Sequence, residues 1–279
     1  MSLIGNKYIL QNKIAEGCFG KIYKGTHQNT KKTVAIKMES KESEMTTIKH
    51  ETVLLNYLYR NGCRDIPFVF WYGLHNEYNC LVMTYFERSL KECAPVFFKK
   101  SEKVNRLMSR MIQIMENIHS YGVIHRDIKV ENFMLIESDI FLIDFGMATL
   151  YIDENKHHIS CNENRTMIMG TPKYISVNIH NGIEPSRRDD LMSIGYLYLF
   201  LYHGELSWQN QPFYDETPYS PMHILHPANL QKKIQKENLL ETLDNSLPIY
   251  SYLKYCSRLS FNENPNYDFL SKIFSAGDF

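Results

Sequence analysis

The sequence predicts an α+β fold in which a small antiparallel β-sheet with one helix precedes a larger, mainly helical part. Up to residue 86, short β-prone runs alternate with clusters of glycine, asparagine and charged residues, which is typical of an antiparallel meander. From residue 87 onward, apolar residues recur at helical spacing. We therefore expect two lobes, residues 1–86 and residues 87–279.

The first lobe should contain five strands and one helix. Strands are expected at residues 8–14, 21–25, 33–37, 68–72 and 80–84. Between residues 42 and 59, Ile48, Leu55 and Leu58 recur at helical spacing and predict a helix.

The second lobe should begin with an amphipathic helix at residues 101–119, followed by two short β runs at 133–136 and 140–143. The most apolar stretch, residues 191–202, is too short to span a bilayer, so we interpret it as a buried helix. Four prolines within residues 209–227 predict an irregular loop.

Charge and cysteine usage exclude several classes of protein. The chain has 31 Lys and Arg and 31 Asp and Glu, so its neutral total indicates neither a nucleic-acid partner nor an anionic membrane. Its six cysteines include no C-x-x-C pair, which argues against a zinc ribbon, a thioredoxin-like site and a disulfide framework. The N-terminal sequence carries no secretory signal pattern. We expect a soluble monomer in the cytoplasm or nucleus, not secreted and without a transmembrane segment.

A buried ion pair is predicted between Lys37 and Glu51. Glu51 lies three residues after Ile48 and four before Leu55, on the helix face expected to meet the sheet. A buried carboxylate needs a cationic partner, and strand alternation places Lys37 on the same face as Ala35. The same pattern also fits a solvated strand lysine and a glutamate at the edge of the helix.

A glycine turn and a polar loop complete the candidate site. Residues 15–22, AEGCFGKI, place Gly17 and Gly20 between two strands. Such a turn either brings backbone N–H groups close to phosphate oxygens or only connects the two strands of a hairpin. Residues 125–132, HRDIKVEN, and 144–146, DFG, contribute Asp127, Asn132 and Asp144, whose oxygens suit Mg²⁺ held jointly with substrate phosphates.

Together these motifs resemble the eukaryotic protein kinases, from about residue 8 to residue 274. Within them the chain looks most like the casein kinase I family, with the vaccinia-related kinase branch as the alternative. The strings that carry this resemblance are GTPKYISVN at 170–178, where most protein kinases show A-P-E, SRRDDL at 186–191 and SWQ at 207–209. The resemblance implies a bilobal protein-kinase-like fold, with both lobes forming one kinase domain, and a serine/threonine kinase that uses ATP and Mg²⁺.

The resemblance also implies roles for individual residues. Lys37, held by Glu51, would contact the ATP phosphates, and Asn132 and Asp144 would hold the metal. Asp127 would accept the proton of the substrate hydroxyl, Lys129 would reach the transferred phosphoryl group, and Thr171 would position both. Asp190 would hydrogen-bond the backbone of the 125–127 turn. The nucleotide would be bound by the glycine loop, by apolar side chains around the adenine and by a hinge, namely Ile14, Gly17, Cys18, Phe19, Gly20, Ile22, Ala35, Met83, Thr84, Phe86, Met134 and Ile143.

Substrate preference is less well specified. The family is noted for acidic or pre-phosphorylated Ser/Thr substrates, and Lys173 matches one member of the basic pocket that reads them, with Arg187 and Arg188 nearby in sequence. The basic run that follows the tryptophan in this family is replaced by Asp215, Glu216 and prolines. Two other functions remain as alternatives: an inactive kinase-fold scaffold and a small-molecule phosphotransferase. The complete set of metal and phosphate residues disfavours the former, and residues 170–174, which resemble a peptide-binding platform, disfavour the latter.

Overall fold

The computed structural model describes residues 3–17, 20–43, 46–137, 139–209 and 217–275, and it divides into two compact units. The N-terminal unit combines Met1–Ser89 with Phe133–Ala148, and the C-terminal unit combines Leu90–Asn132 with Thr149–Phe279. This division differs from the predicted boundary at residues 86 and 87 chiefly in the placement of 133–148. That stretch joins the N-terminal unit because its first strand pairs with residues 88–89 and because the Leu142 N–H donates to Asp65 O at 2.9 Å.

The N-terminal unit is built on a five-stranded antiparallel sheet in the order β1-β2-β3-β5-β4. The strands are β1 (Tyr8–Gly17), β2 (Gly20–His27), β3 (Thr33–Ser40), β4 (Val69–His75) and β5 (Tyr78–Thr84). All five lie where the sequence predicts strands, and each runs at least two residues further than the predicted run.

The register of these strands gives the sheet two different faces, because directly paired residues point the same way. Ile36 pairs with Tyr23 and Val82, and together with Ile4 they belong to an apolar cluster on one face. The other face carries the predicted ligand residues, since Lys37 pairs with Ile22 and Ala35 pairs with Met83.

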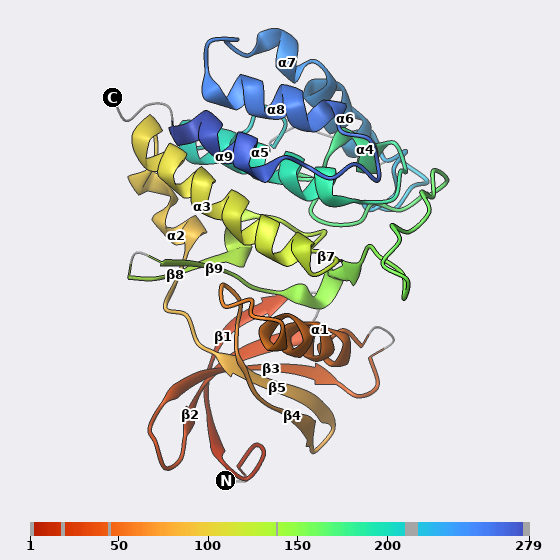
Figure 1. Cartoon of the computed structure of the whole chain (residues 1–279). Coiled ribbons are helices and arrows are strands. Elements are labelled where there is room, and N and C mark those ends of the chain that lie inside the picture. The colour runs from red at the N-terminus through yellow and green to blue at the C-terminus, as the bar shows by residue number, and fades with distance from the viewer. Residues whose placement is uncertain (1–2, 18–19, 44–45, 138, 210–216, 276–279) are drawn as a thin grey trace. The chain divides into compact units, whose positions relative to one another are not determined.

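Helix α1 (Ile48–Arg60) contacts β3, β4 and β5 and lies alongside the sheet (Figure 1). Its buried residues include Ile48, Leu55 and Leu58, which confirms the predicted helical stripe. A second, three-stranded sheet in this unit is formed by β6 (Arg88–Ser89), β8 (Phe133–Ile136) and β9 (Asp139–Leu142). The short 3-10 helix η3 (Phe145–Met147) follows it and contacts α1.

The C-terminal unit is mainly helical. Its central helices are α3 (Ser101–Ser120) and α5 (Arg187–His203), which contact each other, and they are joined by α8 (Pro248–Arg258) and α9 (Tyr267–Ser275) (Figure 1). The remaining elements are α2 (Leu90–Cys93), η1 (Ala94–Val96), β7 (Val123–Ile124), η2 (Val130–Asn132), β10 (Thr149–Leu150), α4 (Val177–His180), α6 (Pro227–Glu237) and α7 (Leu239–Thr242). Among the described helices, none combines the length and apolar character needed to cross a membrane. The predicted buried helix at 191–202 lies within α5.

Candidate functional site

Lys37 is the centre of a buried charge cluster in the N-terminal unit. Its Nζ lies 2.6 Å from Oε2 of Glu51 on α1 and 2.8 Å from Oδ1 of Asp144. The other carboxylate oxygen of Glu51 accepts the backbone N–H of Phe145 at 3.1 Å. The predicted pairing of Lys37 with Glu51 is therefore confirmed, and Glu51 additionally ties α1 to the 144–146 motif.

Burial and charge act in opposite directions on this cluster. Burial alone would lower the pKa of Lys37, but the Glu51 and Asp144 carboxylates outweigh it and raise that pKa above its usual value. Burial raises the pKa of Glu51, and the Lys37 ammonium opposes that rise. Lys37 is therefore held as a cation whose position is set by two carboxylates.

The two glycines of the predicted phosphate turn have different steric surroundings. Gly17 and Gly20 form the last pair between β1 and β2, and the predicted contacts Cys18 and Phe19 lie outside the described residues. Gly20 has a φ of +109°, and a Cβ there would lie 2.3 Å from Met38 O, so the fold itself requires this glycine. A Cβ at Gly17 would meet no atom of the described chain within 4 Å. Gly17 thus leaves open space beside the turn.

Several of the predicted adenine contacts share the sheet face that carries Lys37. Ile22, Ala35 and Met83 lie on this face by register, and Ala35 and Met83 are buried. Ile14 lies at an irregularity of β1 and is largely exposed. The second sheet supplies Met134, which pairs with Phe141 in the β8–β9 ladder.

The remaining predicted nucleotide contacts flank these strands. Phe86 is buried, with its ring centroid 5.1 Å from that of Phe141, and Ile143 follows β9 directly. At the predicted hinge, the Thr84 N–H donates to Phe68 O at 3.0 Å, so this donor already has a partner within the sheet. The Thr84 N–H is therefore not available as a donor to a purine edge.

In the C-terminal unit, polar side chains converge on Asp127. Its Oδ1 accepts the Thr171 hydroxyl at 2.7 Å, and its Oδ2 accepts the Lys129 ammonium at 2.5 Å. The Asn132 amide nitrogen donates to the Asp127 backbone oxygen at 2.9 Å. Three residues that the sequence predicts to act together are thus grouped around one buried carboxylate.

The turn that presents Asp127 is held by Asp190 from α5. The backbone N–H groups of His125 and Arg126 donate to the two Asp190 oxygens at 2.7 and 2.9 Å, as predicted. Burial would raise the pKa of Asp190, but hydrogen bonds and charge from His119 and His125 outweigh it and hold that pKa below its usual value. Arg126 has a φ of 68°, and its carbonyl oxygen would lie 2.4 Å from a Cβ at Gly170. Residue 170 therefore has to be glycine for this approach.

The donor atoms of the two predicted metal ligands suit Mg²⁺. Asp144 offers a carboxylate, one oxygen of which accepts from Lys37. The amide nitrogen of Asn132 donates to the Asp127 backbone oxygen, so a metal would be bound by the side-chain carbonyl oxygen of Asn132. Both are hard oxygen ligands of the kind that Mg²⁺ prefers. Within the described residues, no three His, Cys, Asp or Glu side chains gather in metal-binding geometry. Each of the two residues, taken by itself, is a suitable ligand for Mg²⁺, an ion that takes few protein ligands and keeps water and phosphate in its shell.

Lys173, Arg187 and Arg188 do not form one open basic pocket, because each is engaged with a different part of the C-terminal unit. The Lys173 ammonium lies 4.0 Å from the centroid of the Phe200 ring, and burial lowers its pKa. Arg187 donates to Asn264 Oδ1 and Asn262 O, and Arg188 donates to Leu259 O. The two arginines that lie near Lys173 in sequence are therefore engaged with the segment before α9.

The sequence analysis did not find the side chains that hold segment 170–175. The Lys236 ammonium donates to Pro172 O at 2.9 Å and to Ile175 O at 2.7 Å, and Trp208 Nε1 donates to Lys173 O at 2.8 Å. Lys236 follows Lys232 and Lys233, and three lysines so close together in sequence are typical of a solvated helix face. Its spacing after Ala228 and Asn229, which are also buried, was the available signal.

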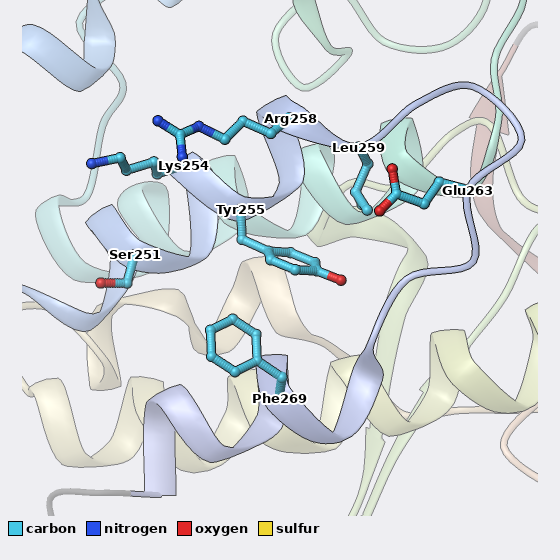
Figure 2. Close-up of a pocket in the computed structure, with 7 residues that line it drawn as sticks. All are labelled: Ser251, Lys254, Tyr255, Arg258, Leu259, Glu263 and Phe269. Carbon is cyan, nitrogen blue, oxygen red and sulfur yellow. The ribbon is translucent and has the colours of Figure 1, made fainter.

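Two cavities lie apart from these residues. One of about 270 Å³ in the C-terminal unit lies between α8 and α9, where Tyr255 and Phe269 approach each other beside Arg258 (Figure 2). It is smaller than the usual range of about 300–1,000 Å³ for small-molecule sites. A second cavity of about 660 Å³ in the N-terminal unit is lined by residues that include Ile4, Tyr23 and Met38, on the sheet face opposite Lys37. Neither cavity contains a predicted site residue.

Comparison with protein-family models identifies the family of the chain. The model of the protein kinase domain matches residues 8–275, which covers nearly the whole chain. A protein kinase is a phosphotransferase that acts on protein substrates and in general uses ATP with a divalent metal. The match extends over more than half of the chain, so the chain belongs to the protein kinase family.

Proposed function

We propose that the protein is a serine/threonine kinase of the casein kinase I type, which transfers the γ-phosphoryl group of ATP to Ser and Thr of protein substrates. The observation that carries this proposal is the arrangement around Asp127. One carboxylate oxygen accepts Thr171 at 2.7 Å and the other accepts Lys129 at 2.5 Å. A carboxylate fixed in this way is suited to orient an alcohol and to take its proton.

The residues of the N-terminal unit would bind the nucleotide. Lys37, fixed by Glu51, would contact the α- and β-phosphates, and the backbone N–H groups between Gly17 and Gly20 would cover them. The apolar face that carries Ala35 and Met83 would lie against the adenine. Support for this comes from the distance of 2.6 Å between Lys37 and Glu51 and from the open space at Gly17.

Five polar side chains would then take part in the transfer of the phosphoryl group. Asp127 would accept the proton of the attacking hydroxyl and orient its oxygen in line, while Lys129 would contact the phosphoryl oxygens. Asn132 and Asp144 would hold Mg²⁺, which when bound neutralises charge on the phosphates. Thr171 would keep the Asp127 carboxylate in its orientation.

The choice of Ser and Thr over Tyr is supported by Lys129, whose position two residues after Asp127 is typical of Ser/Thr kinases. The casein kinase I assignment is supported by the part of the chain that replaces A-P-E. There Ser176 and Asn178 donate to Asp189 Oδ1 at 2.5 and 3.0 Å, so these residues and SRRDDL form one connected unit. The vaccinia-related kinases remain the alternative branch.

A preference for acidic or pre-phosphorylated substrates is proposed through Lys173. Its ammonium is partly exposed beside Phe200, while Arg187 and Arg188 are engaged elsewhere, so a single cation would read the acidic group. Lys173→Ala should raise the KM for a phosphorylated peptide more than the KM for the same peptide without phosphate. Equal changes for both peptides would remove the proposed preference.

The cellular location is proposed to be the cytoplasm or nucleus. Cys63, Cys80, Cys93, Cys161 and Cys256 are all free thiols, which is expected in a reducing compartment.

The test of the proposed function is the identity of the phosphorylated residue. Purified protein is incubated with labelled ATP, Mg²⁺ and either casein, an acidic Ser-peptide or a Tyr-peptide matched to it, and the labelled amino acid is identified. We expect phosphoserine and phosphothreonine. Labelling of tyrosine alone, or transfer only to small molecules, would contradict the proposal, and nucleotide binding without any transfer would indicate a scaffold.

A further inference from the structure

Lys236 is one of two lysines that are buried among the described residues, and the other is Lys37. Lys37 is paired with carboxylates, as a buried cation normally is. The hydrogen bonds of Lys236 go instead to the carbonyl oxygens of Pro172 and Ile175 and to His180 Nε2, at 2.9, 2.7 and 3.1 Å. A buried ammonium is costly, so its use for binding backbone oxygens requires an explanation.

Aromatic rings complete the surroundings of Lys236. Its ammonium lies 5.1 Å from the ring centroid of Tyr196 and 5.6 Å from that of Trp208, at distances where the faces of aromatic rings attract a cation. His180 Nε2 lies 3.1 Å from Lys236 Nζ, and because an ammonium can only donate, a charged Lys236 pairs with a neutral His180 ring whose Nε2 is unprotonated. These contacts hold the ammonium within hydrogen-bond distance of segment 170–175.

Segment 170–175 is thereby fixed through three of its carbonyl groups. Lys236 binds the oxygens of Pro172 and Ile175, and Trp208 Nε1 binds that of Lys173 at 2.8 Å. Within the segment, the Tyr174 N–H donates to Thr171 O at 2.8 Å. Thr171 in turn donates its hydroxyl to Asp127. The backbone next to Thr171 is thus fixed by hydrogen bonds from two buried side chains, Lys236 and Trp208.

We propose that Lys236, assisted by Trp208, is a positioning residue for the protein substrate: it sets the shape of segment 170–175 and so the register in which an acceptor peptide lies beside Asp127. This inference rests on the proposed function. Lys236 itself contacts backbone groups of the chain and acts only through them. Its loss should therefore affect the peptide substrate and leave the nucleotide unaffected.

The test compares two variants of the same helix. Lys236→Met keeps the length of the side chain and removes its donors, whereas Lys233→Met removes a charge that pairs with Glu237 at 3.8 Å near the surface. For Lys236→Met we expect the KM for an acidic Ser-peptide to rise at least tenfold, with the KM for ATP and the rate of ATP hydrolysis without peptide within twofold of wild type. Lys233→Met should leave all three values unchanged.

Trp208→Phe provides a second measurement should Lys236→Met not fold. It keeps an aromatic ring and removes the indole N–H that donates to Lys173 O. We therefore expect a smaller rise in peptide KM than for Lys236→Met, with the KM for ATP again unchanged. An unchanged peptide KM in a folded Lys236→Met protein, or in Trp208→Phe, would overturn the inference, as would parallel changes for peptide and ATP. Wild-type protein that transfers no phosphate in this assay would instead contradict the proposed function, and the inference with it.

Discussion

Backbone geometry requires a glycine at residue 20, whereas it does not require one at residue 17. Gly20 adopts a positive φ and approaches Met38 O, whereas Gly17 is surrounded by open space. We predict that Gly20→Ala lowers the free energy of unfolding by about 1–3 kcal/mol because it strains the backbone. Gly17→Ala should leave stability within about 0.5 kcal/mol of wild type.

Gly17→Ala should nevertheless raise the KM for ATP several-fold, because its methyl group would occupy space that phosphates are proposed to use. Urea unfolding and steady-state kinetics at varied ATP measure the two effects. A Gly17→Ala protein with wild-type KM for ATP would remove the phosphate contact from this turn.

Lys37 contributes to folding as well as to the proposed nucleotide site. Lys37→Met would leave the buried Glu51 carboxylate without its cation, so we expect a loss of about 3–5 kcal/mol in the free energy of unfolding. Adding Glu51→Gln should recover about 1 kcal/mol or more, because the buried charge is then removed as well. Lys21→Met, at a largely exposed lysine 3.9 Å from Glu16, is the control and should change stability by less than about 1 kcal/mol. Equal losses for the single and double variants would contradict the account of this pair.

At the scale of elements, Ser176 connects α4 to α5. Its hydroxyl donates to Asp189 at 2.5 Å and accepts the Ile179 N–H at 3.2 Å, so it caps one helix and binds the first turn of the next. Ser176→Ala should cost about 1–3 kcal/mol in the free energy of unfolding, because it removes a cap and a donor to a buried carboxylate.

Ser257→Ala is the matched control for this prediction. Ser257 is exposed on α8, and its hydroxyl donates to Lys254 O at 3.0 Å within the same helix. Its replacement should cost less than about 0.5 kcal/mol. Similar losses for the two variants in urea unfolding would show that Ser176 has no special connecting role.

The accuracy of the sequence prediction also varies between elements. Helices α1 and α3 were predictable because each buries an apolar stripe of helical period, as Ile48, Leu55 and Leu58 do in α1. Helix α5 was predictable because residues 191–202 are the most apolar stretch of the sequence, and it is buried on most of its surface. The burial of Lys236 and its hydrogen bonds were not predictable. The neighbouring lysines are typical of a solvated helix face, and its partners are backbone oxygens more than 60 residues away in sequence. Likewise, the place of residues 133–148 in the N-terminal unit could not be predicted, because β8 joins it through β6, which has only two residues and no pattern of its own.

At the scale of the whole molecule, buried histidines should make stability depend on pH. Burial together with the charge of Lys236, Lys232 and Lys233 lowers the pKa of His180 to about 2, from an ordinary value of 6.5. The unfolded chain therefore binds a proton below pH 6.5 that the folded chain does not. The stabilisation is present above pH 6.5 and is lost as the pH falls below it.

His180→Gln isolates this contribution. Between pH 7 and pH 5 the wild-type free energy of unfolding should fall by about 2 kcal/mol more than that of His180→Gln. His157→Gln, at a histidine that is 79% exposed, should follow the wild type. Urea unfolding at both pH values measures the difference, and parallel pH dependence of wild type and His180→Gln would contradict a neutral buried His180.

At the scale of the whole molecule, the central proposal is that Asp127 serves as the base in phosphoryl transfer from ATP. The most direct measurement is the rate of phosphate transfer to an acidic Ser-peptide by wild type and by Asp127→Asn, with ATP binding measured alongside. A general base contributes roughly 10²–10⁴-fold, so the account predicts a fall of that size in kcat with ATP binding retained. An Asp127→Asn protein that transfers phosphate at the wild-type rate would contradict it.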